Sequence, residues 1–113
     1  MERDRLKSGI WIQAQIRLCA IANLATYVVK KGDTDAGAIF LRINTLDGTS
    51  CIYSQTRDMS GEIAWSQAGG GKPMDDMVAH EYLEKQKKYD PDLWILEIED
   101  PEGKYQFDGE ILK

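Results

Sequence analysis

The sequence predicts an α+β fold: an antiparallel sheet of about four to six strands with two helices packed on one face. Three observations predict it. Two segments have helical length and spacing, several have the apolar alternation of strands, and one Asp-Gly pair marks a hairpin turn. We find no internal repeat and no linker long enough to divide the chain, so residues 1–113 are expected to form a single α+β domain.

The first helix is expected over 8–24. Its length and its Ala20-Ile21-Ala22 run favour a helix, although its even-numbered apolar residues alternate as they would in a strand. Ser8 is the expected N-cap, because its hydroxyl can accept a hydrogen bond from a free backbone N–H. A β-rich run at 26–31 then predicts a strand, followed by a turn at 32–35.

Asp47-Gly48 is the clearest local signal. This pair supplies the positive φ angles of a type I′ turn, so it is expected to join a strand at 37–43 to a return strand at 49–54. A turn at this place pairs Ile43 with Ile52 and keeps one apolar face in register. A polar loop over 54–61 and a short strand at 62–66 are expected to follow.

The second helix is expected over 74–88, after a flexible break at 68–71. Met74, Val78 and Tyr82 recur at helical spacing and are expected to share one face, and acidic and basic residues lie at the ends that suit the helix dipole. Pro91 ends the helix. A strand is then expected at 93–99, with 104–107 returning as the last strand.

Charge and composition limit the functions open to the chain. A net charge of −5 disfavours nucleic acid as a partner, because that affinity comes largely from Lys and Arg displacing counterions. The weakest hypothesis is therefore nucleic-acid binding through Lys30, Lys31 and Arg42. No stretch approaches the roughly 20 apolar residues of a membrane span, and the opening residues lack the pattern of a secretory signal. We expect a cytoplasmic protein with no membrane partner.

The two cysteines, Cys19 and Cys51, have no metal-ligand spacing and are expected to be buried, reduced thiols. A single disulfide is the alternative. A thiol nucleophile with His80 as its base would rest on residue type alone.

Two local motifs fall short of known ligand loops. The run Gly69-Gly70-Gly71-Lys72 departs from a phosphate-binding loop, because Pro73 follows the lysine and Ser66 stands where the first glycine should be. The acidic pair at 33–35 departs from a calcium loop at its sixth and twelfth positions. The sequence therefore identifies no cofactor-binding residue and no metal ligand.

His80, the only histidine, lies one helical turn from both Asp76 and Glu84. That spacing could hold a metal or orient an imidazole for proton transfer, but it is also typical of a solvated helix face. Glu97 and Glu99 share one face of a predicted strand, with Asp100 directly after them. Carboxylates about 7 Å apart suit hydrolytic or metal chemistry, and they equally suit a wet strand face.

Trp11, Trp65 and Trp94 lie in or beside predicted elements. A buried tryptophan belongs to the core, whereas an exposed one among the three would mark a binding patch. Among the functional interpretations, the sequence favours this one most.

Four segments together resemble an uncharacterised proteobacterial family, the domain-of-unknown-function family numbered 1491. They are LKSGIW at 6–11, KGD at 31–33 with AGA at 36–38, the residues 44–48, and YDPDLW at 89–94 with the residues up to Asp100. The resemblance implies a single cytoplasmic bacterial domain. It supplies no established activity, cofactor or catalytic residue, and 54–73 has no recognisable family pattern.

Two functions remain open. One is a non-enzymatic accessory or protein-interaction domain whose partner is another protein or a second copy, because the sequence holds no catalytic constellation and its apolar strands could pair across a dimer. The alternative is a small carboxylate- or metal-dependent enzyme that uses Glu97, Glu99 and Asp100. No catalytic residue can be named, and these observations weigh against an enzyme.

Overall fold

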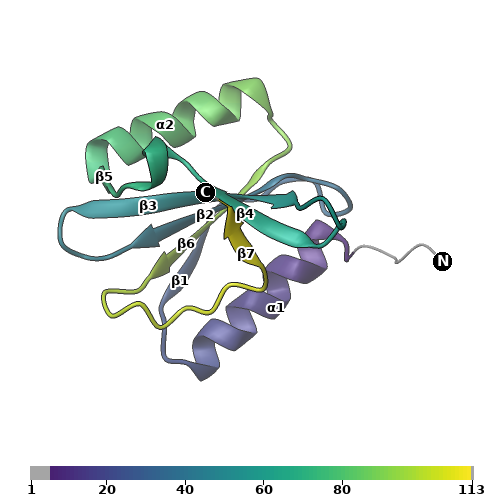
Figure 1. Cartoon of the computed structure of the whole chain (residues 1–113), viewed down its shortest axis with the longest axis horizontal. Coiled ribbons are helices and arrows are strands. Elements are labelled where there is room, and N and C mark those ends of the chain that lie inside the picture. Colours follow the sequence, from purple (N-terminus) through teal and green to yellow (C-terminus); the bar gives the residue numbers. More distant parts are fainter. Residues whose placement is uncertain (1–5, 113) are drawn as a thin grey trace.

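A mixed sheet separates two helices in the computed structural model, which describes residues 6–112 (Figure 1). The strand order is β1-β6-β2-β3-β4-β7, and the short β5 pairs with β3 to make seven strands. The elements are α1 (Ser8–Ile21), β1 (Thr26–Lys30), β2 (Ile39–Asn44), β3 (Thr49–Arg57), β4 (Ile63–Gln67), β5 (Met74–Asp75), α2 (Asp76–Tyr89), β6 (Trp94–Glu99) and β7 (Glu110–Leu112). The α+β class is confirmed.

Two strand pairs are parallel, so the expectation of a purely antiparallel sheet is wrong. β2 pairs with β6 in parallel at the centre, from Ile39 opposite Trp94 to Asn44 opposite Glu99, and β4 pairs with β7 in parallel at one edge. Parallel strands require a long crossover. Between β2 and β6 that crossover contains β3, β4, β5 and α2, so the pairing leaves no local mark in the sequence.

The helices cover opposite faces of the sheet, which also departs from the expectation of one face (Figure 1). Trp11 of α1 packs in one core with Leu96, whereas Leu83 of α2 packs in a second core with Ile95. Leu96 and Ile95 are neighbours on β6, and neighbouring side chains in a strand point to opposite faces. Both faces of β6 are covered at its start, where Trp94, Ile95 and Leu96 are apolar and buried in succession.

The β2–β3 hairpin forms where it was expected, but its register differs by one residue. Ile43 pairs with Cys51 and not with Ile52. A shift of one residue moves a side chain to the other face of the sheet. Ile43 accordingly packs in the core under α1, and Ile52 packs in the core under α2.

The turn explains this shift. Leu46 and Gly48 have positive φ angles of 61° and 90°, and the N–H of Thr45 donates to the carbonyl oxygen of Thr49 at 3.3 Å. The loop therefore has three residues in place of the two of a type I′ turn.

The predicted first helix is confirmed, but Ser8 is its first residue and not its N-cap. The Ser8 hydroxyl donates to the carbonyl oxygen of Gly37 at 2.6 Å. The N–H of Gly9 donates to the carbonyl oxygen of Thr34 at 2.9 Å. The loop before β2 thus satisfies N–H groups at the start of α1. The helix ends at Ile21, earlier than expected.

The second helix begins at Asp76, because Met74 and Asp75 form β5 beside β3. The Asp75 carboxylate caps it by accepting from the N–H of Met77 at 3.0 Å.

The buried face of α2 is made by Ala79 and Leu83. Val78 is exposed, so the prediction that it shares a buried face with Met74 and Tyr82 is wrong. Met74 and Tyr82 do pack partly against the core. The pattern misled because Ala79 is small, and small residues add little to an apolar periodicity.

Three connections differ from the expectation. β3 continues to Arg57, so the predicted loop at 54–61 shortens to a turn whose Asp58 carboxylate accepts from the N–H groups of Ser60 and Glu62. The break at 68–71 contains a single 3-10 turn, Gly69–Gly71. The segment 104–107 is not a strand, and the last strand is β7.

Neither helix within residues 6–112 combines the length and the apolar character needed to cross a membrane.

Candidate functional site

The predicted carboxylate cluster does not converge into one site. The Asp100 side chain is buried, and its two oxygens accept from the N–H groups of Lys104 and Tyr105, both at 2.8 Å. Glu97 instead accepts from the side-chain amide of Asn44 at 3.1 Å and lies 4.0 Å from the Nε of Arg42. Asp100 therefore shapes a turn, and Glu97 belongs to a polar network between the sheet and α2.

Arg42 is the centre of that network. Its Nη2 lies 3.2 Å from the Asp76 carboxylate, and its Nε donates to the hydroxyl of the buried Ser50 at 3.1 Å. The Ser50 hydroxyl in turn donates to the same Asp76 oxygen at 2.8 Å. These bonds tie the first turn of α2 to the sheet, so Arg42 does not present its charge together with Lys30 and Lys31.

The histidine set is likewise dispersed. His80 is exposed on α2, while Asp76 turns to Arg42 and Glu84 accepts from Lys87 at 2.6 Å. That lysine lowers the pKa of the Glu84 carboxyl below its ordinary value. No group of three or more His, Cys, Asp or Glu residues suited to a metal ion occurs in the described part of the chain.

Both cysteines are free thiols and pack on the α1 side of the sheet. His80 lies on α2, on the other side, so neither thiol meets it as a base. Burial raises the pKa of the Cys19 thiol, and the charge of Asp100 raises it further. Cys19 thus remains a protonated core residue at neutral pH.

The three tryptophans are all core residues, with exposed fractions of 3% for Trp11, 0% for Trp65 and 5% for Trp94. The interpretation of an exposed tryptophan as a binding patch is therefore wrong. Each indole N–H has a partner. Trp94 donates to the carbonyl oxygen of Asp33 at 2.7 Å, and the other two donate to Asp108.

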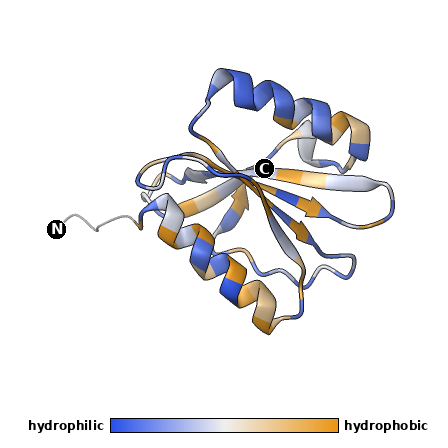
Figure 2. Ribbon diagram, turned by 180° about the vertical axis from the view of Figure 1, so that it is seen from behind, coloured by the Kyte–Doolittle hydropathy of each residue, from blue (hydrophilic) through white to orange (hydrophobic). Residues whose placement is uncertain are grey.

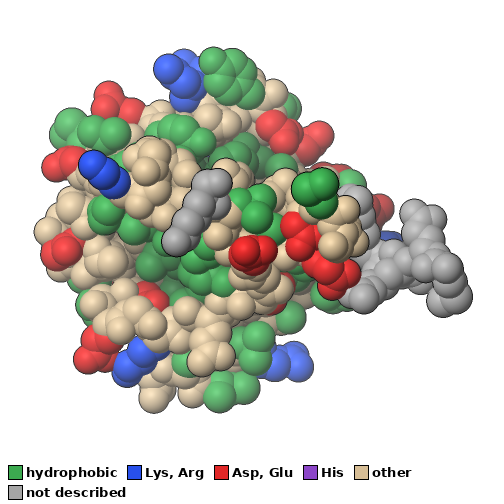
Figure 3. Space-filling view, viewed as in Figure 1, with side chains coloured by type: hydrophobic (Ala, Val, Ile, Leu, Met, Phe, Trp, Pro, Cys, Tyr) green, Lys and Arg blue, Asp and Glu red, His purple; other side chains and the backbone are tan. Residues whose placement is uncertain are grey.

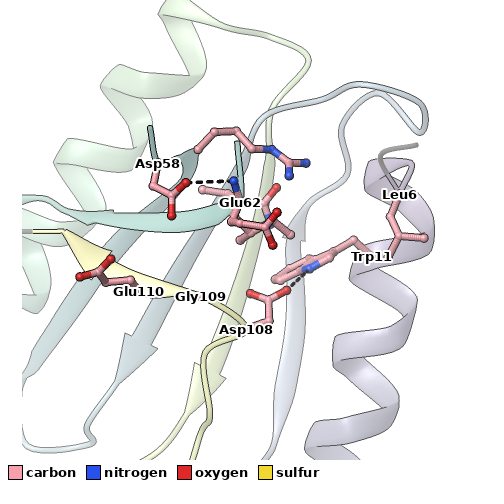
Figure 4. Close-up of a pocket in the computed structure, with 10 residues that line it drawn as sticks. Leu6, Trp11, Asp58, Glu62, Asp108, Gly109 and Glu110 are labelled. Carbon is pink, nitrogen blue, oxygen red and sulfur yellow. Dashed lines mark hydrogen bonds between the residues drawn. The ribbon is translucent and has the colours of Figure 1, made fainter. Parts of the chain in front are cut away.

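Asp108 lies in the wall of an open cleft of about 450 Å³ between the start of α1, the β3–β4 turn and the start of β7 (Figure 4). Leu6 and Trp11 contribute apolar surface, and further carboxylates come from Asp58, Glu62 and Glu110. Figure 3 shows acidic side chains gathered beside apolar ones on this side of the molecule.

Two carboxylates of the cleft, those of Asp108 and Asp58, accept hydrogen bonds from within the fold. Asp108 accepts one indole N–H on each oxygen, at 2.7 Å from Trp11 and 3.1 Å from Trp65. Asp58 closes its own turn through two backbone N–H groups. Arg57, also in the wall, adds a positive charge and donates to the carbonyl oxygen of Gly61. The cleft is thus built chiefly by structural bonds.

A second surface is apolar and open to solvent. We define the α1–β1 surface as five residues: Ile10, Leu18, Ile21, Val28 and Val29, which are between 44% and 76% exposed. Tyr27 is also exposed, but it pairs with Glu97 and therefore faces the α2 side of the sheet. On α1 the residues of this surface recur at helical spacing, and α1 packs beside β1. β1 is an edge strand, so nothing in the described chain extends the sheet beyond it.

The physical origin of this surface is visible in the sequence of α1. Its apolar residues surround the helix and do not form a single stripe, so one set faces the sheet and another faces water. In Figure 2, α2 is mostly hydrophilic, whereas α1 carries hydrophobic segments along its length. Ile10, Ile12 and Ile16, whose alternation resembled a strand, indicated this helix with apolar residues on both its buried and its exposed side.

Comparison with known proteins finds one family. The family described as "Protein of unknown function (DUF1491)" matches residues 6–108. No curated protein matches the chain.

Solved structures agree with this family. The crystal structure of a DUF1491 family protein from Caulobacter crescentus CB15 is 28% identical, with a TM-score of 0.84 over 96% of this chain and 100% of that one. An NMR structure of a DUF1491 family protein from the same organism has a TM-score of 0.80 at 28% identity, covering 98% and 100% of the two chains. A solution structure of a protein from A. tumefaciens is 31% identical, with a TM-score of 0.71 over 86% of this chain and 87% of that one. The chain therefore belongs to the DUF1491 family, as the four sequence segments predicted.

Proposed function

We propose that this chain is a bacterial cytoplasmic domain that acts by binding another protein and not by catalysis. The observation that carries the proposal is the α1–β1 surface, where five apolar side chains lie exposed on one helix and the neighbouring edge strand. Exposed apolar side chains that gather on one part of a protein surface mark interaction sites, because a partner that covers them removes apolar area from water.

The carboxylates also favour this function over the enzyme. Glu97 and Asp100 are engaged in separate structural networks, and Cys19 and His80 lie on opposite sides of the sheet. A hydrolytic or metal-dependent site requires such groups to converge on one reacting atom. No group of three or more His, Cys, Asp or Glu residues that could hold a metal ion occurs among residues 6–112.

Capture of a partner from extracts of the source cells tests the function. We expect the wild-type chain to retain a protein that the double variant Ile21→Ser, Val28→Ser loses, because both substitutions remove exposed apolar area and leave the core intact. Val78→Ser on α2 is the matched control, since Val78 is equally apolar and 51% exposed.

The control should retain the partner in full. Equal capture by all three chains, or no capture by any of them, would contradict the proposed function. Sedimentation of the purified chain shows separately whether the captured partner is a second copy.

A further inference from the structure

We propose that the partner of the α1–β1 surface presents aspartate or glutamate carboxylates around an apolar anchor. This inference rests on the proposed function and specifies the chemistry of the partner. Two observations support it. Charge is unevenly distributed along the chain, and two exposed cations of residues 6–32 have no ionic partner within the described part of the fold.

The region that builds the surface has the opposite charge to the rest of the protein. Residues 6–32 contain four basic side chains and no acidic one. Residues 33–112 contain seven basic and seventeen acidic side chains. The segment that carries the α1–β1 surface is therefore cationic within an anionic protein, which favours an anionic partner because like charges brought together at an interface are costly.

Two of the four cations are used by the fold itself. Lys30 turns inward, and its Nζ donates to the carbonyl oxygens of Pro91 at 2.6 Å and Leu93 at 3.1 Å. The Nζ of Lys7 lies 3.8 Å from a carboxylate oxygen of Asp35.

The other two cations are presented to solvent beside the apolar residues. Arg17 is exposed and lies one turn of α1 before Ile21, on the same face. Lys31 is exposed directly after β1. Neither has a carboxylate within ion-pair distance among residues 6–112. They are thus placed to pair with carboxylates that flank an apolar anchor.

A second copy of the chain does not satisfy these cations. The α1–β1 surface contains no carboxylate, so a symmetric contact through α1 would bring the two Arg17 side chains near each other without an anion between them. The edge of β1 is also poorly suited to strand addition, because a bulge interrupts its register between Val28 and Lys30. The geometry therefore favours a different protein that docks by side-chain contacts.

A membrane surface is the other anionic partner, and the structure favours it less. Each cation near an anionic bilayer contributes little binding energy, and stable attachment requires a larger basic cluster or a lipid anchor. Arg17 and Lys31 supply only two such charges.

The test measures binding of two synthetic amphipathic peptides by fluorescence anisotropy. One is built from leucine and glutamate, and the other has lysine in place of every glutamate. We expect the glutamate peptide to bind and the lysine peptide not to bind. The double variant Arg17→Glu, Lys31→Glu should lower the affinity for the glutamate peptide by about tenfold or more. The charge-preserving variant Arg17→Lys, Lys31→Arg and the remote reversal Lys85→Glu, Lys88→Glu should bind as the wild type does.

Failure of the glutamate peptide to bind, equal binding of the lysine peptide, or indifference to the charge reversal would overturn the inference. Retention on phosphatidylglycerol vesicles that the charge reversal abolishes would also overturn it, in favour of a membrane. If Ile21→Ser, Val28→Ser loses the cellular partner while the charge reversal retains it, the proposed function stands and only this inference falls.

Discussion

The indole N–H of Trp11 donates a 2.7 Å hydrogen bond to Oδ2 of Asp108, which joins α1 to the segment that leads into β7. Trp65 donates to the other oxygen of the same carboxylate at 3.1 Å, and the two indole rings lie 5.5 Å apart. One aspartate therefore fixes the orientation of two of the three tryptophans in the core under α1.

Replacing Asp108 by Ala should lower the free energy of unfolding by about 1–3 kcal/mol, because the indole N–H groups of two buried tryptophans lose their acceptor in part-buried hydrogen bonds. Urea denaturation followed by tryptophan fluorescence measures this loss. Glu110→Ala is the control, since Glu110 is exposed and carries the same charge. Equal stability of the two variants would show that the indole bonds contribute nothing.

Leu83 and Val78 test which face of α2 is buried. Leu83→Ala should cost about 2–5 kcal/mol, because it opens a cavity beneath the helix. Val78→Ala should change the unfolding free energy by no more than about 0.5 kcal/mol, since Val78 is exposed. Thermal or urea unfolding of the two variants separates them, and the reverse order would restore the face predicted from periodicity.

Gly32 packs where no side chain fits. A Cβ atom at this position would lie 2.2 Å from the carbonyl oxygen of Asp92. Gly32→Ala should therefore cost about 1–3 kcal/mol through overpacking. Gly9→Ala is the matched control, because its Cβ would meet Thr34 at an ordinary 3.4 Å and alanine favours a helix by roughly 0.5–1 kcal/mol. A Gly32→Ala protein as stable as the wild type would contradict this close approach.

Asp47 should make stability depend on pH in the acidic range. The hydroxyls of Thr45 and Thr49 each donate to its Oδ1 at 2.7 Å, and these bonds lower the pKa of the carboxyl. A lowered pKa in the folded state stabilises the protein above the ordinary aspartate pKa, and this contribution is lost as the pH falls through the folded value.

An NMR titration of the Asp47 carboxyl should accordingly show a midpoint below that of an ordinary aspartate. Thr49→Val should move the midpoint upward, because it removes one hydroxyl donor. A midpoint that does not respond to Thr49→Val would separate the low pKa from the hydrogen bond.

The sequence by itself determined the local elements, because each depends on residues close together along the chain. The aspartate and lysine ends of α2, the strand at 93–99 and the hairpin at Asp47-Gly48 all follow from helix electrostatics, apolar runs and turn chemistry. The family assignment also follows from short segments read in order.

Only the tertiary structure decided how these elements pair and what they leave exposed. The parallel placement of β6 beside β2 depends on a crossover of many residues, and a three-residue turn in place of two sent Ile43 and Ile52 to opposite cores. Whether Ile21 is buried or open likewise depends on which side of α1 the sheet covers. Long-range packing sets these choices, and no local periodicity encodes it.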